Sequence, residues 1–350
     1  MIGISALIPV RNAGDSLVDT VRAVLAQAES DVQLEVILID DRSDDAAVEL
    51  VRRQLPGAPI VAVQGEGRGA AAAINRGLES ARYPLVAQID QDVVLREGWL
   101  AHLLPVMADA AVAAVQGQYV TDARASLLAR VMGRDLQERY VPLDADTGHV
   151  CTGNVLYRAS ALRDVGGFDE TLGYGYDNDM SYRLRASGYQ LRYVPAAQST
   201  HRWRDGLVGY VRQQYGFGYG RLDLVAKHRD RLTGDSVSPV MMMAHPVVTA
   251  LALCVLGVSV VVPASASITA ALGIALLLGL AGERAWVGVR AARRFDDWVP
   301  LLFPAVHLVR DVAWVTAIAV WLVRRALGRR PRPRHSMRPR RVDGSGAEPA

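Results

Sequence analysis

Short apolar runs alternate with segments of helical spacing through the first 235 residues of the chain. Buried strands are predicted at residues 4–10, 35–41 and 60–63, because these runs are apolar and bounded by polar turns. Between them, apolar residues recur three and four positions apart, which predicts helices near 17–25 and 46–55. Strands that alternate with helices in this order are typical of an α/β protein with a parallel, doubly wound sheet.

Polar side chains follow several of the predicted strands at their carboxyl ends, including a fourth apolar run at residues 85–89. Ligands of doubly wound sheets bind beyond these strand ends. An isolated Asp-X-Asp pair is most often a solvated pair of loop acids, but the convergence of polar residues favours a ligand site. The residues expected at this edge are Asn12, Asp40, Asp41, Asp90 and Asp92.

Asp90 and Asp92 stand two positions apart at the exit of a strand, so their side chains point to the same side of the sheet. Two like charges so close repel each other unless a cation neutralises them. A hard divalent ion that also binds phosphate oxygens, such as Mg²⁺ or Mn²⁺, suits carboxylate ligands. The pair therefore indicates a metal site for a phosphorylated ligand.

The glycine-rich segment 65–69 is similar to a dinucleotide-binding loop, but it follows the third predicted strand and not the first. Gly69 is instead expected to begin a helix of small residues at 70–81. In that arrangement Arg68 and Asn75 face the ligand, although a plain packing helix remains an open alternative for Asn75.

The next stretch predicts a helix at 99–107, a strand at 112–120, an amphipathic surface helix at 124–138 and a strand at 149–157. Thr152, Gly153 and Asn154 interrupt the last of these strands. A glycine inside a strand often marks the close approach of a ligand or another backbone.

A glycine-rich turn at residues 173–176 precedes a predicted helix. Met180 and Leu184 stand four residues apart on its core side, and Asp179 can pair with Arg183 on another face. Asp177, in the first turn, can project into a cleft. A further strand is predicted at 191–194 and leads toward His201.

These motifs, in this order, resemble glycosyltransferase family 2, the inverting nucleotide-sugar transferases with the GT-A fold. The resemblance covers about residues 4–231, and its specificity lies in the ordered set, since no single motif is specific. The motifs are residues 9–12, 39–44, 75–77, 90–92, 152–154, 166–170 and 177–179.

The resemblance implies a role for each matching position on the donor side. Either Asp40 or Asp41 hydrogen-bonds the nucleotide base, since a ring N–H is a natural donor to a carboxylate. Asp92 ligates Mg²⁺ or Mn²⁺ on the diphosphate, with help from Asp90 and from His201, for which an ordinary surface histidine is the alternative. The implied donor-binding residues are Pro9, Asn12, Asp40, Asp41, Arg68, Asn75 and Asp90.

The resemblance also implies a general base, which takes the proton of an acceptor hydroxyl. The family often has Glu-Asp at this place, whereas this chain has Tyr176-Asp177, so the base is assigned to Asp177 with Asp179 as the next candidate. The missing glutamate leaves acceptor recognition open. The implied acceptor-binding residues are Thr152, Gly153, Asn154, Tyr176 and Asp179.

Segment 210–220 alternates aromatic residues with glycines and is similar to the region before the membrane helices of exopolysaccharide-type members. Two interpretations are open: a helix with a glycine-rich break that lines the acceptor side of the cleft, or a linker helix. Residues 198–203 are one residue longer than the Gln-X-X-Arg-Trp motif of processive synthases, which argues against processivity.

From residue 241 onward the chain is mostly Ala, Val, Leu and Gly. Segments 241–262 and 265–282 carry no charge and predict a helical hairpin long enough to span a bilayer, which takes about 20 apolar residues. Arginines and lysines on both flanks place both ends in the cytoplasm. Segment 298–323 is apolar but includes His307, Arg310 and Asp311, which favours an interfacial or re-entrant segment, or two short helices.

Nine arginines between residues 324 and 341 form a local basic tail, whereas the net charge of the chain is only +3. Residues 328–350 are expected to be disordered and to bind anionic lipid heads. This charge balance gives no reason to expect nucleic acid as a partner. The N-terminal segment leads directly into a strand, so no signal peptide is expected, and Cys151 and Cys254 are expected to stay unpaired, as in a reducing compartment.

The sequence thus predicts a GT-A domain at 1–235, a membrane region at 236–327 and a tail at 328–350. The predicted function is a metal-dependent, inverting glycosyltransferase (a hexosyltransferase) on the cytoplasmic face of the cell membrane. It would move a sugar from a nucleotide-diphosphate donor to a hydroxyl of a lipid-linked or cell-envelope glycan. The alternatives are a polyprenyl-phosphate sugar synthase, whose phosphate acceptor needs no base, and a non-catalytic nucleotide-sugar-binding scaffold.

Overall fold

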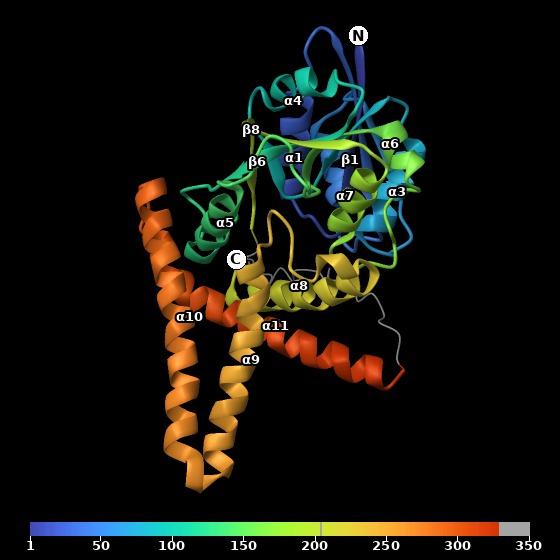
Figure 1. Ribbon diagram of the computed structural model, residues 1–350. Helices are drawn as coiled ribbons and strands as arrows, with labels where there is room; N and C mark the ends of the chain where they lie inside the picture. The colour runs from blue at the N-terminus through green and yellow to red at the C-terminus, as the bar shows by residue number, and fades with distance from the viewer. Residues whose placement is uncertain (204, 329–350) are drawn as a thin grey trace, which may run out of the picture.

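The computed structural model describes residues 1–203 and 205–328. Figure 1 shows an α/β domain from which two long helices project. The strands are β1 (Ile2–Val10), β2 (Val32–Asp40), β3 (Ile60–Gln64), β4 (Leu85–Ile89), β5 (Val93–Leu95), β6 (Val112–Val120), β7 (Asn154–Arg158) and β8 (Gln190–His201). The helices of the domain are α1 (Ser16–Leu25), α2 (Ala47–Gln54), α3 (Ala70–Ser80), α4 (Trp99–Met107), α5 (Leu127–Tyr140), α6 (Ala159–Asp164) and α7 (Tyr176–Ala186). The helices that follow are α8 (Leu207–Lys227), α9 (Val240–Val261), α10 (Ala266–Phe295) and α11 (Phe303–Ala326).

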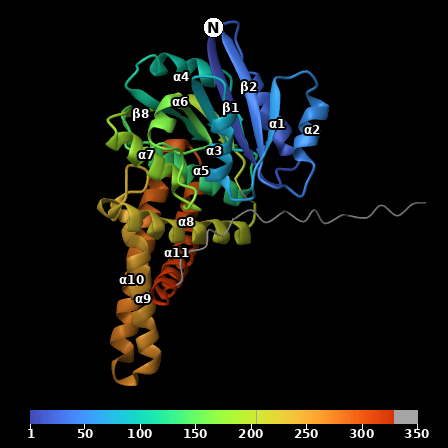
Figure 2. The same ribbon diagram turned by 90° about the vertical axis from the view of Figure 1, so that its right-hand side faces the viewer.

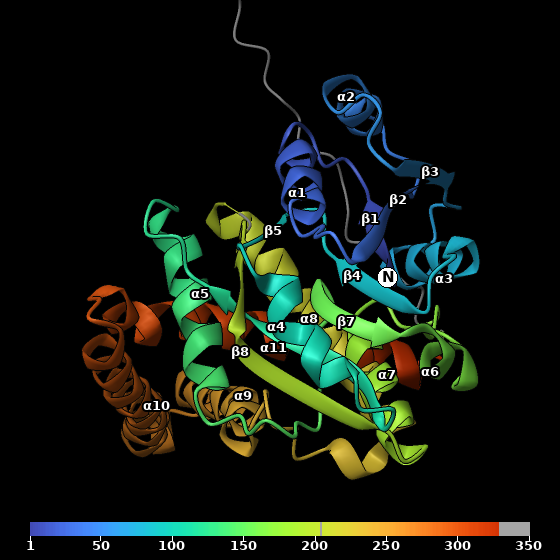
Figure 3. The same ribbon diagram turned by 90° about the horizontal axis from the view of Figure 1, so that it is seen from above.

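The strands form one eight-stranded sheet in the order β3-β2-β1-β4-β7-β6-β8-β5. The first half is parallel, as the alternation of strands and helices predicted. Neighbouring residues of β1 alternate between two apolar clusters, with Ile8 packed on one face and Leu7 on the other. Helices α1, α2 and α4 cover the first face, and α3, α6 and α7 cover the second (Figure 3). The predicted α/β fold is therefore confirmed.

The second half of the sheet is mixed, which the sequence did not reveal. Strand β7 runs antiparallel to both β4 and β6, and β5 runs antiparallel to β8. The strand predicted at 149–157 begins only at Asn154. The prediction was wrong for the preceding residues because Gly153 has a φ of +93°, a conformation that no regular strand contains.

Helix α5 was predicted as a surface helix, but it joins the α/β domain to the C-terminal helices. Arg130 and Arg134 both pair with Asp297 at 2.9 Å, beyond the end of α10. Val131 packs in an apolar cluster with Phe303 at the start of α11. An amphipathic pattern reveals that a helix has a polar face but not whether another element covers that face, so the prediction missed this contact.

Within the described residues, three helices are long and apolar enough to cross a membrane: the helix Val240–Val261, the segment Pro263–Phe295 and the segment Val299–Ala326. Helices α9 and α10 form an antiparallel pair that projects from the domain (Figures 1 and 2). Helix α10 continues to Phe295, well beyond the predicted end at residue 282. Its charged last turns pack on α5 through Arg290 and Arg294, which both pair with Glu138.

Helix α11 is continuous, in place of the two short helices that were one alternative for this segment. It lies along α8, to which the indole N–H groups of Trp314 and Trp321 donate hydrogen bonds at Gln214 and Asp223. The described residues end at Gly328, so the tail at 329–350, for which disorder and lipid binding were predicted, lies outside them.

Helix α8 has no break at its glycines, whereas one of the two interpretations of segment 210–220 included a break. A Cβ on Gly216 or Gly220 would overlap Tyr174, and a Cβ on Gly218 would lie 2.9 Å from the Cα atom of Trp314. The three glycines therefore let α8 approach the 174 loop on one side and α11 on the other. Close packing, and not flexibility, accounts for this part of the aromatic and glycine pattern.

The charges inside α11 point inward and are paired. Arg284 of α10 and Asp311 of α11 form an ion pair, and the side chain of each is 2% exposed. Asp135 of α5 lies 3.0 Å from His307 and 3.5 Å from Arg310. Burial raises the pKa of Asp135, but the neighbouring cations outweigh burial and hold that pKa well below its usual range. These pairs explain how an apolar helix tolerates three ionisable residues.

Replacing Arg284 with methionine is expected to lower the free energy of unfolding by about 3 kcal/mol, because the buried Asp311 carboxylate then keeps only the more distant Arg310, at 3.8 Å, as a cation. The double variant Arg284→Met/Asp311→Leu should recover most of this loss, since both charges are gone. Arg290→Met is the control, because the Arg290 side chain is 55% exposed and its partner Glu138 keeps a second cation, Arg294. Thermal unfolding of the detergent-purified chain measures all three; equal stability of the Arg284 and Arg290 variants would contradict the buried pair.

Candidate active site

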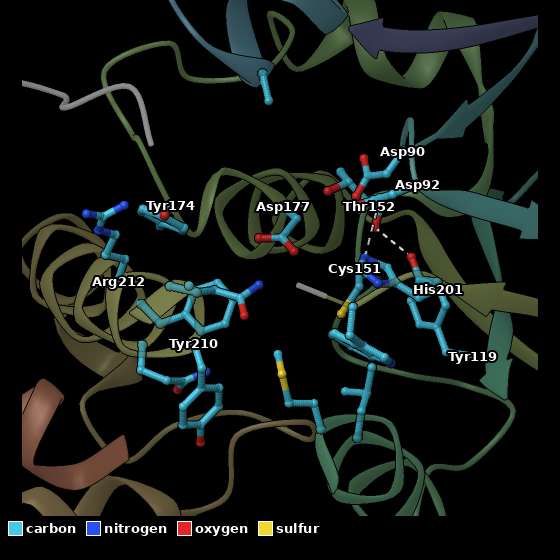
Figure 4. Close-up of a pocket in the computed structure, with 18 of the residues that line it drawn as sticks. Asp90, Asp92, Tyr119, Cys151, Thr152, Tyr174, Asp177, His201, Tyr210 and Arg212 are labelled. Carbon is cyan, nitrogen blue, oxygen red and sulfur yellow. Dashed lines mark hydrogen bonds and ion pairs between the residues drawn. The ribbon is translucent and has the colours of Figure 1, made fainter. Parts of the chain in front are cut away.

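A cavity of about 1170 Å³ opens beyond the carboxyl ends of β1, β2 and β4 and extends to α8 and α11. Figure 4 shows Asp177 near its middle, with the Asp90–Asp92 pair on one side and Tyr210 and Arg212 of α8 on the other. The register of the parallel strands creates this arrangement, because Val10 of β1 pairs with Asp40 of β2 and their exits therefore coincide.

Two strand ends bring Asp90, Asp92 and His201 together. Asp90 follows the fully buried strand β4, while His201 ends β8 and pairs with Val93 of β5. The Nε2 atom of His201 lies 3.6 Å from an Asp92 carboxylate oxygen. One ligand atom from each residue lies within 4.8 Å of the others. The predicted trio is thus adjacent in space, although His201 is 109 positions beyond Asp92 in the sequence.

The electrostatics of this trio fit a divalent cation. Burial and repulsion from Asp92 raise the pKa of Asp90 to about 6. A hydrogen bond from the Gln88 side chain lowers this pKa but does not outweigh them. The Nδ1 atom of His201 is buried and has no hydrogen-bond partner among the described residues. Two carboxylates and an imidazole offer the oxygen and nitrogen ligands that Mg²⁺ or Mn²⁺ accepts.

Gly153 supports Asp90 from behind. Its backbone N–H donates to the Gln88 side chain, and its carbonyl accepts a hydrogen bond from the Asp90 N–H at 3.4 Å. With a φ of +93°, it leaves room for the Asp90 carboxylate, since a Cβ at this position would lie 2.5 Å from Oδ2. The expected acceptor contact of Gly153 is replaced by this supporting role, because the residue lies behind the carboxylate and not in the cavity wall.

The variant Gly153→Ala is expected to weaken metal-dependent donor binding by at least about tenfold, or 1.4 kcal/mol, because Asp90 must move away from the added methyl group. Gly148→Ala is the matched control, since nothing lies within 4 Å of the Cβ that it adds. Calorimetric titration with Mn²⁺ present compares the two variants. Equal affinity in both would show that the Gly153 backbone does not position Asp90.

On the donor side, the carboxylate of Asp41 organises the glycine-rich loop before α3. It accepts hydrogen bonds from the N–H groups of Gly67, Arg68 and Gly69 at 2.6, 3.2 and 2.8 Å. Asp41 lines the cavity, whereas the Asp40 carboxylate turns away to accept from the N–H of Ser43. Of the two acids left open by the sequence, the structure thus places Asp41 in the cavity wall.

Pro9, Asn12 and Arg68 complete this end of the cavity. Gln91, the middle residue of the Asp-Gln-Asp motif, was not singled out from the sequence. Its side chain bonds both the N–H and the carbonyl of Arg11, at 2.7 and 3.2 Å. Gln91 therefore joins the loop after β1 to the acid pair. Its position between the two acids of the motif was the signal in the sequence that could have revealed this role.

Asp177 stands in the first turn of α7, after Gly175 in the left-handed conformation. Its side chain is 22% exposed and faces the cavity (Figure 4). The N–H of Asn178 donates to its Oδ1 atom at 2.9 Å, and His149 approaches its Oδ2 atom. Thr152 and Tyr176, two predicted acceptor residues, line the cavity beside it and share a hydrogen bond at 3.4 Å.

The family model described as Glycosyl transferase family 2 matches residues 5–166. This chain belongs to glycosyltransferase family 2. The pre-mycofactocin glycosyltransferase of Mycobacterium tuberculosis H37Rv is 32% identical over 251 residues, which are 69% of this chain and 51% of the relative. The poly-β-1,6-N-acetyl-D-glucosamine synthase of Staphylococcus aureus MW2 is 26% identical over 226 residues, which are 62% of this chain and 54% of the relative. The chain thus spans about half the length of these curated relatives.

Solved structures share the fold at low identity. The mannosyltransferase PcManGT of Pyrobaculum calidifontis, in complex with GDP-Man and Mn²⁺, superposes with a TM-score of 0.58 at 19% identity, covering 91% of this chain and 86% of that one. TarS 1–349 of S. aureus, in complex with UDP-GlcNAc, gives a TM-score of 0.50 at 14% identity, covering 95% and 93%. The predicted GT-A fold of family 2 is therefore confirmed.

Three residues of the family 2 motifs lie outside the cavity wall, contrary to the expectation that they contact substrate. Asn75 bonds both backbone groups of the 168 turn, at Phe168 N and O, at 2.8 and 2.9 Å. Asn154 is fully buried and accepts from the indole of Trp99. Asp179 is 0% exposed, and it pairs with Arg183 as predicted and also with Lys227 and His228. Each of these side chains holds in place a loop or helix that lines the cavity. At these three motif positions the polar residue therefore supports the site and does not line it.

The far end of the cavity is formed by α8 and α11 of this family 2 chain. Tyr210, Gln214, Phe217 and Leu224 of α8 line it together with Trp314 of α11, whose indole N–H donates to the Gln214 side chain. Segment 210–220 therefore lines the cavity, as one of the two interpretations predicted, but as a continuous helix without the predicted break.

Proposed function

We propose that this protein is a membrane-associated, metal-dependent, inverting glycosyltransferase that moves a sugar from a nucleoside-diphosphate donor to a hydroxyl of a lipid-linked or cell-envelope glycan. One observation carries the proposal: a single cavity joins the Asp90–Asp92–His201 trio to Asp177 and continues to the helices beside the α9–α10 hairpin. Donor, base and acceptor path therefore meet in one space.

On this proposal, Asp90, Asp92 and His201 would hold Mg²⁺ or Mn²⁺. When bound, the ion stabilises the charge of the departing diphosphate. The nucleotide would lie against Pro9, Asn12 and the loop that Asp41 organises, with Arg68 near its phosphates. The complexes of two neighbours of the same fold with GDP-Man and UDP-GlcNAc support a nucleotide sugar as the donor class.

Asp177 would act as the general base. It lies in the first turn of α7, and its side chain faces the cavity. One of its oxygens takes the proton of the acceptor hydroxyl while the acceptor oxygen attacks the anomeric carbon opposite the diphosphate. The new bond forms on the face away from the leaving group, so the anomeric configuration inverts. Base catalysis of this kind contributes about 10²–10⁴-fold in rate.

The acceptor would enter from the membrane side. Aromatic residues, including Tyr210, Phe217 and Trp314, line that end of the cavity. The α9–α10 hairpin, with basic residues on both flanks, would cross the membrane from the cytoplasmic face, and α11 would lie along the interface beside α8. An acceptor anchored in the bilayer would then reach Asp177 without leaving the membrane surface.

The position of Asp177 favours this function over its two rivals. A polyprenyl-phosphate acceptor is already ionised and needs no base, yet Asp177 faces the cavity beside the acid pair. A non-catalytic scaffold has no need of a base and a metal trio in the same space.

A donor screen tests the proposal. The full chain in detergent is incubated with UDP- and GDP-sugars, Mn²⁺ or EDTA, and octyl glycosides as acceptor mimics, and released nucleoside diphosphate is measured. We expect release from one donor, lost with EDTA and increased by an acceptor. Release that is independent of metal, or no release from any donor, would contradict the proposed function.

A further inference from the structure

Three side chains, His149, Cys151 and Tyr140, form a row of contacts that begins at Asp177. The Nε2 atom of His149 is 3.8 Å from Oδ2 of Asp177, and its Nδ1 atom is 3.9 Å from the sulfur of Cys151. The hydroxyl of Tyr140 in turn donates to that sulfur at 3.0 Å. His149 is only 3% exposed, so this row connects the domain core to the proposed base.

The His149 loop and the helix of Asp177 are fixed to each other by the hydroxyl of Ser181. This hydroxyl donates to the carbonyl of Asp177 at 2.8 Å and to that of Val150 at 3.3 Å, and it accepts from the N–H of Val150 at 3.1 Å. Thr147 further bonds the His149 carbonyl at 3.0 Å. These hydrogen bonds hold the backbone next to His149 against α7, and the imidazole therefore lies beside the Asp177 carboxylate.

The Nε2 atom of His149 has no hydrogen-bond partner among the described residues, although it is buried. A buried polar atom without a partner is costly. In proteins without substrate, catalytic hydrogen bonds are often long and shorten only when the substrate is bound. The Oδ2 atom of Asp177 is the acceptor that this nitrogen faces.

We propose that His149 is a positioning residue for the base, and that its Nε2–H donates to Oδ2 of Asp177 when an acceptor is bound. This inference rests on the proposed function of Asp177. With Asn178 N–H on Oδ1 and His149 on Oδ2, the plane of the carboxylate is fixed. A free lone pair is then directed at the acceptor hydroxyl.

The protonation of His149 agrees with this role. Burial lowers the pKa of the imidazole, but Cys151 and Asp177 outweigh burial and raise that pKa above its usual value. A charged ring carries hydrogen on both nitrogens, and a neutral ring that accepts from the Cys151 thiol carries it on Nε2. The Nε2 atom is therefore a donor in both states.

His149, Cys151 and Asp177 also form a set whose ligand atoms lie within 4.8 Å of one another, which is a possible metal site. The orientation of the ring argues for the hydrogen-bonded row. The ring directs Nδ1 toward Cys151 and Nε2 toward Asp177. A metal ion bound by all three residues would need a single nitrogen that faces both of the other ligands.

The test compares His149→Leu, His149→Asn and His149→Gln in the full chain, with transfer to octyl glycosides as the assay. Glutamine can place an amide N–H where Nε2 stands, whereas asparagine is too short. We expect His149→Leu and His149→Asn to lower kcat by about 10–100-fold with the donor KM unchanged, and His149→Gln to stay within about fivefold of wild type. If His149→Leu fails to fold, the comparison of asparagine with glutamine remains decisive.

A double-mutant cycle separates positioning from a merely structural role. In the Asp177→Asn background, adding His149→Leu should change the rate by less than about twofold, because the two residues act as a unit. A full additional loss, or equal activity of the asparagine and glutamine variants, would overturn the proposal. Inhibition by Zn²⁺ that Cys151→Ser abolishes would also overturn it, in favour of a metal site. If wild type itself releases no nucleoside diphosphate from any sugar donor, the proposed function fails, which is a different result.

Discussion

Asp177→Asn is expected to lower the rate of sugar transfer by about 10²–10⁴-fold while donor Kd stays within about twofold. Asparagine keeps the shape of the side chain and can still accept from the N–H of Asn178, but its amide cannot take the acceptor proton. The proposed donor contacts, from Asp41 and the Asp90–Asp92 pair, are untouched. Binding and chemistry should therefore separate in this one variant, in single-turnover assays beside calorimetric titration of the donor.

If Asp177 only stabilises the start of α7, asparagine replaces it at little cost, since the two residues cap helices about equally well. That view predicts nearly normal transfer. Asp146→Asn makes the same change at a carboxylate that is 50% exposed and pairs with Arg185, so it controls for the substitution itself. Transfer by Asp177→Asn within a few-fold of the control would mean that the base lies elsewhere.

Asp92→Ala is expected to abolish turnover and to weaken Mn²⁺-dependent donor binding by at least about 100-fold, or 2.7 kcal/mol. The Asp92 side chain is 35% exposed and lies toward the cavity, where the metal and diphosphate would meet. Its removal leaves Asp90 and His201 as an incomplete ligand set. Isothermal titration with the donor, in Mn²⁺ and in EDTA, measures the effect.

The fold should survive this change. Asp92 raises the pKa of Asp90 by repulsion, so alanine removes an unfavourable interaction in the metal-free protein, and its melting temperature should not fall. Asp122→Ala is the matched control, because Asp122 lines the same cavity but lies outside the metal trio. Undiminished metal-dependent binding in Asp92→Ala would remove Asp92 from the metal site.

The N-terminal half of the fold and the acid pair were predictable because their causes are local. A strand buried on both faces must be almost wholly apolar, as β1 is, and the polar residue that follows must lie at the sheet edge. Asp90 and Asp92, which follow the buried strand β4, are of this kind. The start of α7 beside Asp177 was predictable from the glycine-rich turn before it, whereas the meeting of Asp177 with the acid pair was implied only by the family resemblance.

The missed features depend on contacts between distant segments. Asn75 and Asp179 carry polar side chains that suit a ligand equally well, and only the fold reveals that they bond the 168 turn and Lys227. The partners of α5 at the end of α10 and in α11 lie more than 150 residues further along the chain, as for Arg134 with Asp297. His149 was overlooked because nothing in its neighbourhood in the sequence marks it, while α7 brings Asp177 beside it.

The anomeric configuration of the product tests the central claim most directly. Once the donor screen has identified a nucleotide sugar, transfer to an octyl glycoside is followed by proton NMR, with Mn²⁺ and with EDTA. We predict a product whose glycosidic configuration is opposite to that of the donor, formed only when metal is present. A product of retained configuration, or transfer that continues in EDTA, would contradict a metal-dependent displacement with Asp177 as the base.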